Sequence, residues 1–180
     1  FINIYQSSIQ DENCPNKMTI KWDRELNSYL RRKISKTFSE EQITASLYKP
    51  FTKMNFYFDR HFNGMTYQWF NIYRPEGQNL VISFNVGSTE FLSLVSDVII
   101  CQGTLLVGGG STQCTPLYRY DNEGKRVDNI TDWAFTKFQK YYRDKKITKE
   151  NLFHYVYAVL HHPAYRTKYE LNLKREVPRI

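Results

Sequence analysis

The hydrophobic pattern of this chain changes its period along the sequence, and this change constrains the fold more than any other feature. Between residues 54 and 121, short runs rich in Val, Ile, Phe and Tyr are separated by Gly, Pro, Asn and Asp, as is typical of β-strands. Before and after this part, apolar residues recur at helical spacing. The sequence therefore predicts an α+β fold, with a central, mainly antiparallel sheet over about residues 54–121 flanked by N-terminal helices and a C-terminal helical segment.

Five runs within this part are expected to form strands. A segment with Pro, Gly and Asn at 74–79 separates two of them, which predicts a turn and an antiparallel hairpin. Polar loops that contain glycine are expected at 61–66 and 103–113. The five strand runs are 54–60, 66–75, 79–86, 96–103 and 114–121.

Two helices are expected before the strands. The first lies within 21–33, where Asp23 is a suitable N-cap and basic residues gather at the helix end that favours cations. The second begins at Ser39, which matches a capping box with Gln42, and ends at Pro50. The inward-facing residues of this second helix would be Ile43 and Leu47.

Three helices are expected after the strands. Thr131 and Thr148 are suitable N-caps, and apolar residues recur at helical spacing behind each of them. Pro163 fits the first position of a last helix, 163–174, because its missing N–H would have no partner within the helix. The residues expected in the core are Trp133, Phe138, Leu152, Val156 and Leu160.

Composition restricts the class of partner. Lys and Arg number 25 against 18 acidic residues, and the net charge of +7 favours an anionic partner such as nucleic acid. Aromatic residues make up 16% of the chain; most would fill the core, and a minority could stack on bases. No segment has the roughly 18 uncharged apolar residues of a membrane span. Three distant cysteines without metal-binding spacing indicate reduced thiols in a cytoplasmic protein.

Motifs for catalysis are incomplete. The segment 103–109 resembles a P-loop, but Gly109 stands where the phosphate-binding lysine is required. Glu123 and Lys125 have the E-x-K form of a metal-dependent nuclease, with Asp97 as an upstream carboxylate, yet this segment fits an ordinary turn better. No catalytic and no metal-binding residue is therefore predicted.

Three stretches, 47–59, 96–121 and 147–180, carry more specific patterns. The last contains "FHYVYAVLH", then P-A-Y-R-x-K-Y, and ends with "LKREVPRI". Together they resemble the C-terminal specificity domain of type ISP restriction–modification enzymes. In that family one polypeptide carries a nuclease, a helicase-like motor, an adenine methyltransferase and, last, a target-recognition domain. Residues 1–46 are poorly covered by the resemblance.

The resemblance implies that residues 1–180 are a single target-recognition domain, a piece of a larger polypeptide, that recognises a specific sequence in double-stranded DNA. A methyltransferase domain upstream of Phe1 in the same polypeptide would be a second partner. S-adenosylmethionine, ATP and Mg²⁺ would be bound by upstream domains, so no cofactor is expected here. Lys49 stands where the family commonly has Arg, which keeps the charge without the bidentate fork.

Recognition of a duplex needs basic side chains on the phosphates and polar side chains at the base edges. The phosphate-binding residues expected are Arg24, Arg31, Arg32, Lys33, Lys36, Lys49 and Lys53. The base-reading residues expected are His61, Asn63, Gln68, Gln78, Asn85, Ser88 and Thr89.

Two other classes of function stay open at the level of the sequence. One is a non-catalytic protein-docking module, whose basic face would meet an acidic neighbouring domain. The other is a metal-dependent nuclease that uses Glu123 and Lys125.

Overall fold

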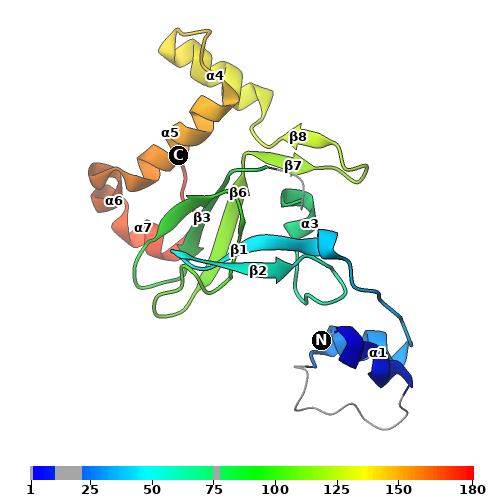
Figure 1. The fold of residues 1–180 in the computed structure, drawn as a ribbon. Helices are drawn as coiled ribbons and strands as arrows, with labels where there is room; N and C mark the ends of the chain where they lie inside the picture. The colour runs from blue at the N-terminus through cyan, green and yellow to red at the C-terminus, as the bar shows by residue number, and fades with distance from the viewer. Residues whose placement is uncertain (1, 11–21, 75–77) are drawn as a thin grey trace. The chain divides into compact units, whose positions relative to one another are not determined.

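A computed structural model of the chain describes residues 2–10, 22–74 and 78–180. It has the predicted α+β fold, with three small, mostly antiparallel sheets in place of one central sheet (Figure 1). The helices are α1 (Ile2–Gln10), α2 (Arg24–Arg31), the 3₁₀ turn η1 (Glu40–Gln42), α3 (Trp69–Ile72), α4 (Asp132–Tyr142), α5 (Lys149–His161), α6 (Pro163–Lys168) and α7 (Glu170–Arg175). The strands are β1 (Ile43–Lys49), β2 (Thr52–Tyr57), β3 (Val81–Val86), β4 (Ser93–Ser96), β5 (Ile99–Ile100), β6 (Ser111–Pro116), β7 (Tyr118–Tyr120) and β8 (Arg126–Asp128).

The chain divides into two compact units. The first unit comprises Phe1–Thr44 and Asn55–Tyr67, and the second unit comprises Ala45–Met54 and Gln68–Ile180. Within the described parts of the chain, none of the helices is long and apolar enough to cross a membrane.

The core of the first unit is small and aromatic. Tyr5 of α1 and Leu26 of α2 are buried, and Trp22 and Phe62 pack around them. The predicted cap of α2 is confirmed, since the side chain of Asp23 accepts a hydrogen bond from the Leu26 N–H at 2.7 Å. Each helix of this unit is therefore fixed by few buried side chains.

The second predicted helix, from Ser39, is wrong. The chain forms only the turn η1 there, and the side chain of Ser39 makes no capping hydrogen bond. Residues 43–49 are instead the strand β1. Ile43 and Leu47 are four residues apart, and this spacing fits one side of a strand as well as one face of a helix. The spacing alone could not separate the two structures.

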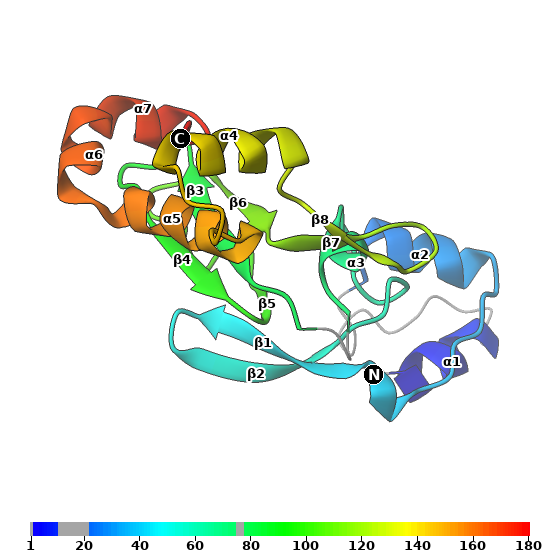
Figure 2. The same ribbon diagram turned by 90° about the horizontal axis from the view of Figure 1, so that it is seen from above.

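The main sheet of the second unit has the order β4-β3-β6, and both pairings are antiparallel. The central strand β3 is buried on both sides. Its Ile82 and Phe84 pack with Phe153 and Leu160 of α5, which lies along one face of the sheet (Figure 2). Toward the other face, Leu47 of β1 packs with Ile100 and Leu105. Strand β1 also pairs in parallel with β5.

Two of the predicted strands are shorter or absent. The run 66–75 contains the helical turn α3, because Trp69, Ile72 and Tyr73 have the spacing of one helix face. The hairpin predicted at 74–79 is therefore wrong in its first strand, and residues 75–77 of its turn lie outside the described residues. In the run 96–103, only Ile99–Ile100 form a strand, β5.

The two C-terminal N-caps are confirmed, whereas the predicted core is confirmed only in part. Thr131 accepts a hydrogen bond from the Ala134 N–H, and Thr148 forms a capping box with Asn151. Leu160 is buried, but Trp133 is 71% exposed, so its prediction as a core residue is wrong. Helix α4 buries no residue, because its outer face has no partner within the chain described here. Phe138, Leu152 and Val156 are half-buried.

The last predicted helix is divided into α6 and α7. Pro163 takes the first position of α6, as predicted. The two helices meet at Tyr169, and Leu173 of α7 is buried. Arg166 donates from Nε to the Leu160 carbonyl at 2.7 Å, which binds α6 to the end of α5.

Candidate nucleic-acid interface

Asn85, near the end of β3, connects two loops of the second unit. Its side chain is 1% exposed, and its amide nitrogen donates to the carbonyls of Glu90 and Leu105 at 2.7 and 2.9 Å. Its Oδ1 accepts a hydrogen bond from the Leu92 N–H at 2.8 Å. Asn85 therefore ties both the loop that follows β3 and the loop that follows β5 to strand β3.

The glycines at 108–110 allow these two loops to touch. All three have positive φ. A Cβ on Gly110 would lie 2.3 Å from the carbonyl oxygen of Val86, and one on Gly108 would lie 2.9 Å from Cγ2 of Thr89. A side chain at Gly110 or Gly108 would push against the loop after β3, so these two glycines have a packing role, whereas a Cβ on Gly109 would meet nothing within 4 Å.

Ser88 joins the loop after β3 to two other parts of the second unit. Its hydroxyl and the Thr89 N–H both donate to the carbonyl of Val107. Its own N–H donates to the carbonyl of Lys174 in α7 at 3.2 Å. The C-terminal segment that carries the family-like phrase thus supports this loop directly.

The β1–β2 hairpin is anchored to the same loops. Thr104 donates from Oγ1 to the carbonyls of Leu47 and Tyr48 at 3.3 and 3.1 Å, and the Cys101 N–H donates to Leu47 at 2.9 Å. The hairpin and the loop that follows β5 are therefore hydrogen-bonded to each other a few residues before the hairpin turn.

These hydrogen-bonded segments form one continuous set, which we name the loop platform: the hairpin residues 45–54, the loops 87–92 and 101–110, and strand β6. Strand β6 is an edge strand of its sheet. The platform segments contain one acidic residue, Glu90, and two lysines, both on the hairpin. The exposed side chains of the platform include Lys49, Phe51, Lys53, Thr89, Glu90, Gln102, Leu106, Val107, Gln113 and Thr115.

The platform offers the two kinds of group that a duplex requires. Lysine is a compact charge that suits phosphate, and the terminal amide of Gln can form a bidentate pair with adenine in the major groove. Lys49 and Lys53 make no ion pair with any residue in the described ranges. A hairpin and an edge strand that project polar groups can reach a groove that admits two-stranded ribbons.

Comparison with known families decides the class of the chain. Residues 1–180, the whole chain, match the family model of the type ISP C-terminal specificity domain. The chain belongs to this family.

Three solved structures with the same fold are complexes with DNA or with a DNA substrate mimic. A DrdV–DNA complex solved by cryo-EM matches 100% of the present chain, with 38% identity and a TM-score of 0.89. A nuclease-deletion mutant of the type ISP restriction–modification enzyme LlaGI, in complex with a DNA substrate mimic, matches over 99% with 26% identity and a TM-score of 0.77.

The ATP-dependent type ISP restriction–modification enzyme LlaBIII, bound to DNA, shares the fold over 99% of the chain with a TM-score of 0.81 and 24% identity. The specificity domain covers 18%, 12% and 17% of the DrdV, LlaBIII and LlaGI chains, respectively. No match was found among curated proteins.

Four of the seven base-reading residues predicted for the specificity domain are engaged within the fold. Asn85 and Ser88 hold the loops, as described above. Asn63 donates both amide hydrogens to the carbonyls of Tyr57 and Asp59, at 2.8 and 2.7 Å. His61 is buried against Tyr29, with ring centroids 4.2 Å apart. Polarity alone did not separate side chains that hold the backbone from side chains that face solvent.

The other three predicted base-reading residues, Gln68, Gln78 and Thr89, are exposed. Gln68 accepts a hydrogen bond from Asn71 at 2.6 Å, and Thr89 donates to Val107 at 3.2 Å. Their role in base reading stays a prediction.

The predicted phosphate-binding residues fall into two groups. Lys49 and Lys53 lie on the loop platform. Five lie in the first unit, where Lys36 forms an ion pair with Asp59 at 3.2 Å. The remaining four, on α2 and directly after it, are exposed: Arg24, Arg31, Arg32 and Lys33.

His61 is a packing residue of the first unit. Burial lowers the pKa of its imidazole, the charge of Lys36 lowers it further, and Asp59 opposes this effect. Its Nε2 is buried without a hydrogen-bond partner among the described residues. A neutral ring stacked on Tyr29 is therefore the form that this environment favours.

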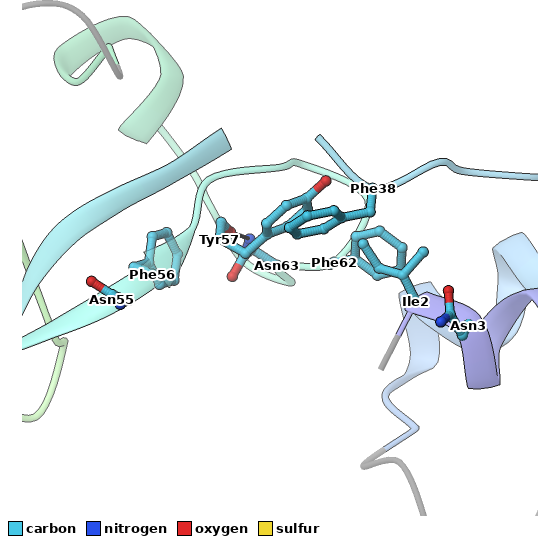
Figure 3. A pocket seen from close by; sticks show the side chains of 8 residues that line it. All are labelled: Ile2, Asn3, Phe38, Asn55, Phe56, Tyr57, Phe62 and Asn63. Atoms are coloured by element: carbon cyan, nitrogen blue, oxygen red, sulfur yellow. Dashed lines mark hydrogen bonds between the residues drawn. The ribbon is translucent and has the colours of Figure 1, made fainter. Parts of the chain in front are cut away.

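The first unit also contains a pocket of about 560 Å³ (Figure 3). Phe38 lies over Tyr57 on one wall, with ring centroids 5.6 Å apart and an interplanar angle of 19°. Ile2, Phe56 and Phe62 extend the apolar lining. The amide hydrogens of Asn63, which also lines the pocket, are used by the backbone. The pocket therefore combines aromatic and apolar walls with the side chains of Asn3 and Asn55.

The segment with Glu123 and Lys125 is a turn, as the sequence favoured. Asp121 accepts hydrogen bonds from the N–H groups of both residues, at 3.0 and 2.9 Å, in the connection between β7 and β8. Gly124 has a φ of 80° in this turn. Across the described residues, no three His, Cys, Asp or Glu side chains gather as metal ligands.

Sequence reasoning missed the exposed amides of the platform. Gln102 is the second residue after β5, and Gln113 lies on β6. The sequence predicted a loop up to residue 113 and a strand from residue 114, whereas β6 begins at Ser111. A signal was present, since 111–115 reads Ser-Thr-Gln-Cys-Thr, a polar run with no charge. Such a run suits an edge strand that faces a polar partner.

Proposed function

We propose that this specificity domain recognises a specific sequence in double-stranded DNA through the loop platform. The observation that carries the proposal is the match of the entire chain, at 38% identity, to part of a DrdV–DNA complex. The positive charge of the chain supports a duplex as the ligand.

In this proposal the two kinds of exposed group have separate tasks. Lys49 and Lys53 bind phosphates and set the register of the duplex. Gln102 and Gln113 read base edges, together with the exposed hydroxyls of Thr89 and Thr115. The basic residues of α2 add phosphate contacts without reading sequence.

We further propose that, within a longer polypeptide, the domain positions methyltransferase, motor and nuclease domains on the DNA in the cytoplasm. S-adenosylmethionine, ATP and Mg²⁺ would then be bound by those domains, and this chain by itself would not be an enzyme. The outer face of α4 suits such a domain contact, because Trp133 and Tyr141 are 71% and 79% exposed. This face is also what a protein-docking module would use.

The proposal is tested by selecting duplexes from a randomised library with the 180-residue chain, at two salt concentrations. Lys49→Ala with Lys53→Ala should weaken binding to all duplexes alike, and each lost phosphate contact should remove roughly 0.9 from the slope of log K against log salt. Gln102→Ala or Gln113→Ala should relax the preference at one or two positions by about 1–3 kcal/mol.

The matched control removes the same charge elsewhere in the second unit. Lys140→Ala with Lys145→Ala, on α4 and in the loop after it, should leave both the salt slope and the selected sequence unchanged. Equal loss of binding in the two double variants would show that only total charge matters. Failure of the wild-type chain to select any sequence at low salt would reject the proposal and favour the docking module. DNA cleavage on addition of Mg²⁺ would favour the nuclease.

A further inference from the structure

The turn of the β1–β2 hairpin carries a phenyl ring that contacts almost nothing in the chain. Phe51 is 99% exposed and lies with Pro50 between the two strands. Proline at this position of a turn fixes one backbone torsion and stiffens the connection. The backbone therefore holds the ring in solvent, and the ring contributes no hydrophobic burial to the stability of the isolated chain.

The residues that flank the ring in the sequence have a single sign of charge. Lys49 and Lys53 lie two residues before and two residues after Phe51, and both are exposed. The Nζ of Lys49 lies 5.4 Å from the ring centroid of Tyr48. No acidic residue occurs between positions 43 and 58. The hairpin turn is thus an apolar tip between two cations.

Hydrogen bonds support the hairpin close to its turn. Thr104 and Cys101 donate to the carbonyls of Leu47 and Tyr48, and Ser46 donates from Oγ to the Met54 carbonyl at 3.3 Å. These bonds end one residue before Lys49. A short, braced hairpin can place a ring with less loss of entropy than a flexible loop.

We propose that Phe51 enters the base stack of the bound duplex as a wedge, while Lys49 and Lys53 contact phosphates on either side of the opened step. The inference rests on the proposed function and adds a mechanical role to the platform. Apolar side chains that enter a base step unstack it, and basic residues nearby compensate for the strain by contacts with the backbone. A protein partner for the tip would be expected to bring acidic groups to the two lysines, and its presence is an outcome of the test.

The test uses the 180-residue chain and duplexes selected by it, with 2-aminopurine placed at successive positions, because the emission of this base rises when it is unstacked. Wild-type protein should raise the emission at one step. Phe51→Ala should abolish this rise and weaken binding roughly 5- to 150-fold, the range for loss of a base–aromatic contact. Its salt slope should stay unchanged, since no charge is lost. Phe51→Trp should retain the signal.

Two controls separate the wedge from other effects. Lys49→Ala with Lys53→Ala should lower the salt slope yet keep an emission rise at saturation. Tyr141→Ala, which removes another exposed ring of the second unit, should change neither quantity. Thermal melting of Phe51→Ala should match the wild type, because the ring packs on nothing.

The outcomes for the wedge and for the proposed function differ. Sequence-selective binding with the same affinity and emission in Phe51→Ala would overturn the wedge alone, and would assign the tip to a protein partner. Absence of selective binding by the wild-type chain would overturn the proposed function and the wedge with it.

Discussion

An asparagine near each end of strand β3 makes the same three kinds of hydrogen bond, but the two asparagines fix different parts of the fold. Asn79, just before the strand, donates to the carbonyls of Ile72 and Tyr118 at 2.8 Å each and accepts from the Tyr118 N–H at 3.1 Å. Asn85, at the far end, makes three equivalent bonds. One end fixes α3 and β7, and the other fixes the loops of the platform.

This comparison separates stability from recognition. Both asparagines are buried, and both satisfy backbone groups that would otherwise lack partners. Asn85 holds two loops of the platform, one of which carries the exposed Gln102 and is hydrogen-bonded to the hairpin with Lys49 and Lys53. Loss of either side chain should destabilise the second unit, but only the loss at the platform end should change how DNA is read.

The largest effect is expected in the core that both ends share. Leu160→Ala removes a fully buried side chain that packs under β3, and it should lower the free energy of unfolding by about 2–5 kcal/mol. Urea unfolding followed by circular dichroism measures this loss. The protein that remains folded should select the same DNA sequence as the wild type. An unchanged midpoint would show that α5 faces the sheet differently.

Asn85→Ala and Asn79→Ala should each cost about 1–3 kcal/mol, because each leaves buried backbone groups unpaired. Duplex selection should then distinguish the two variants. Asn85→Ala should broaden the selected sequence, since the platform loops lose their common support. Asn79→Ala should keep the sequence of the wild type. Equal broadening in both would mean that general loosening, and not the platform, sets specificity.

A smaller effect of pH is expected in the first unit. The pKa of His61 is lowered in the folded state, so the unfolded chain binds the proton first as the pH falls. Stability should therefore decrease as the pH drops below about 6.5, the ordinary value for histidine, and stop decreasing below the folded pKa. Melting of wild type and His61→Phe between pH 5 and 8 measures the difference. A wild-type profile as flat as that of the variant would contradict the burial of a neutral ring.

The smallest effect is expected at Ser83, in the middle of β3. Its hydroxyl is buried and has no hydrogen-bond partner among the described residues. Ser83→Ala should therefore be neutral or stabilising, within about 1 kcal/mol, in contrast to the two asparagines on either side. A loss as large as that of Asn85→Ala, measured by the same urea titration, would reveal a partner of the hydroxyl.

Local signals predicted local structure well. The N-caps at Asp23, Thr131 and Thr148 are formed by a side chain and a backbone N–H a few residues away, so the sequence contains both partners. Pro163 at the start of α6 is a signal of the same kind. These features depend on little outside their own helix.

Features that depend on distant partners were not predicted. The segment 43–49 is a strand because it pairs with β2 on one side and with β5, about fifty residues later in the chain, on the other, and no spacing within 43–49 reveals these pairings. Trp133 lies on the outer face of a helix whose cap was predicted correctly. Asn85 was predicted to read bases because it is polar, but its partners at Glu90 and Leu105 are known only once the loops have folded.

Hydroxyl-radical footprinting of the 180-residue chain with a selected duplex tests the central claim most directly, because it reports which exposed side chains the DNA covers. The platform and α4 both present reactive side chains: Phe51 and Met54 are 99% and 52% exposed, and Trp133 and Tyr141 are 71% and 79% exposed. We predict that DNA protects Phe51 and Met54 from oxidation and leaves Trp133 and Tyr141 unprotected. Protection of Trp133 and Tyr141 with no change at Phe51 and Met54 would contradict the assignment of the loop platform as the DNA-reading surface.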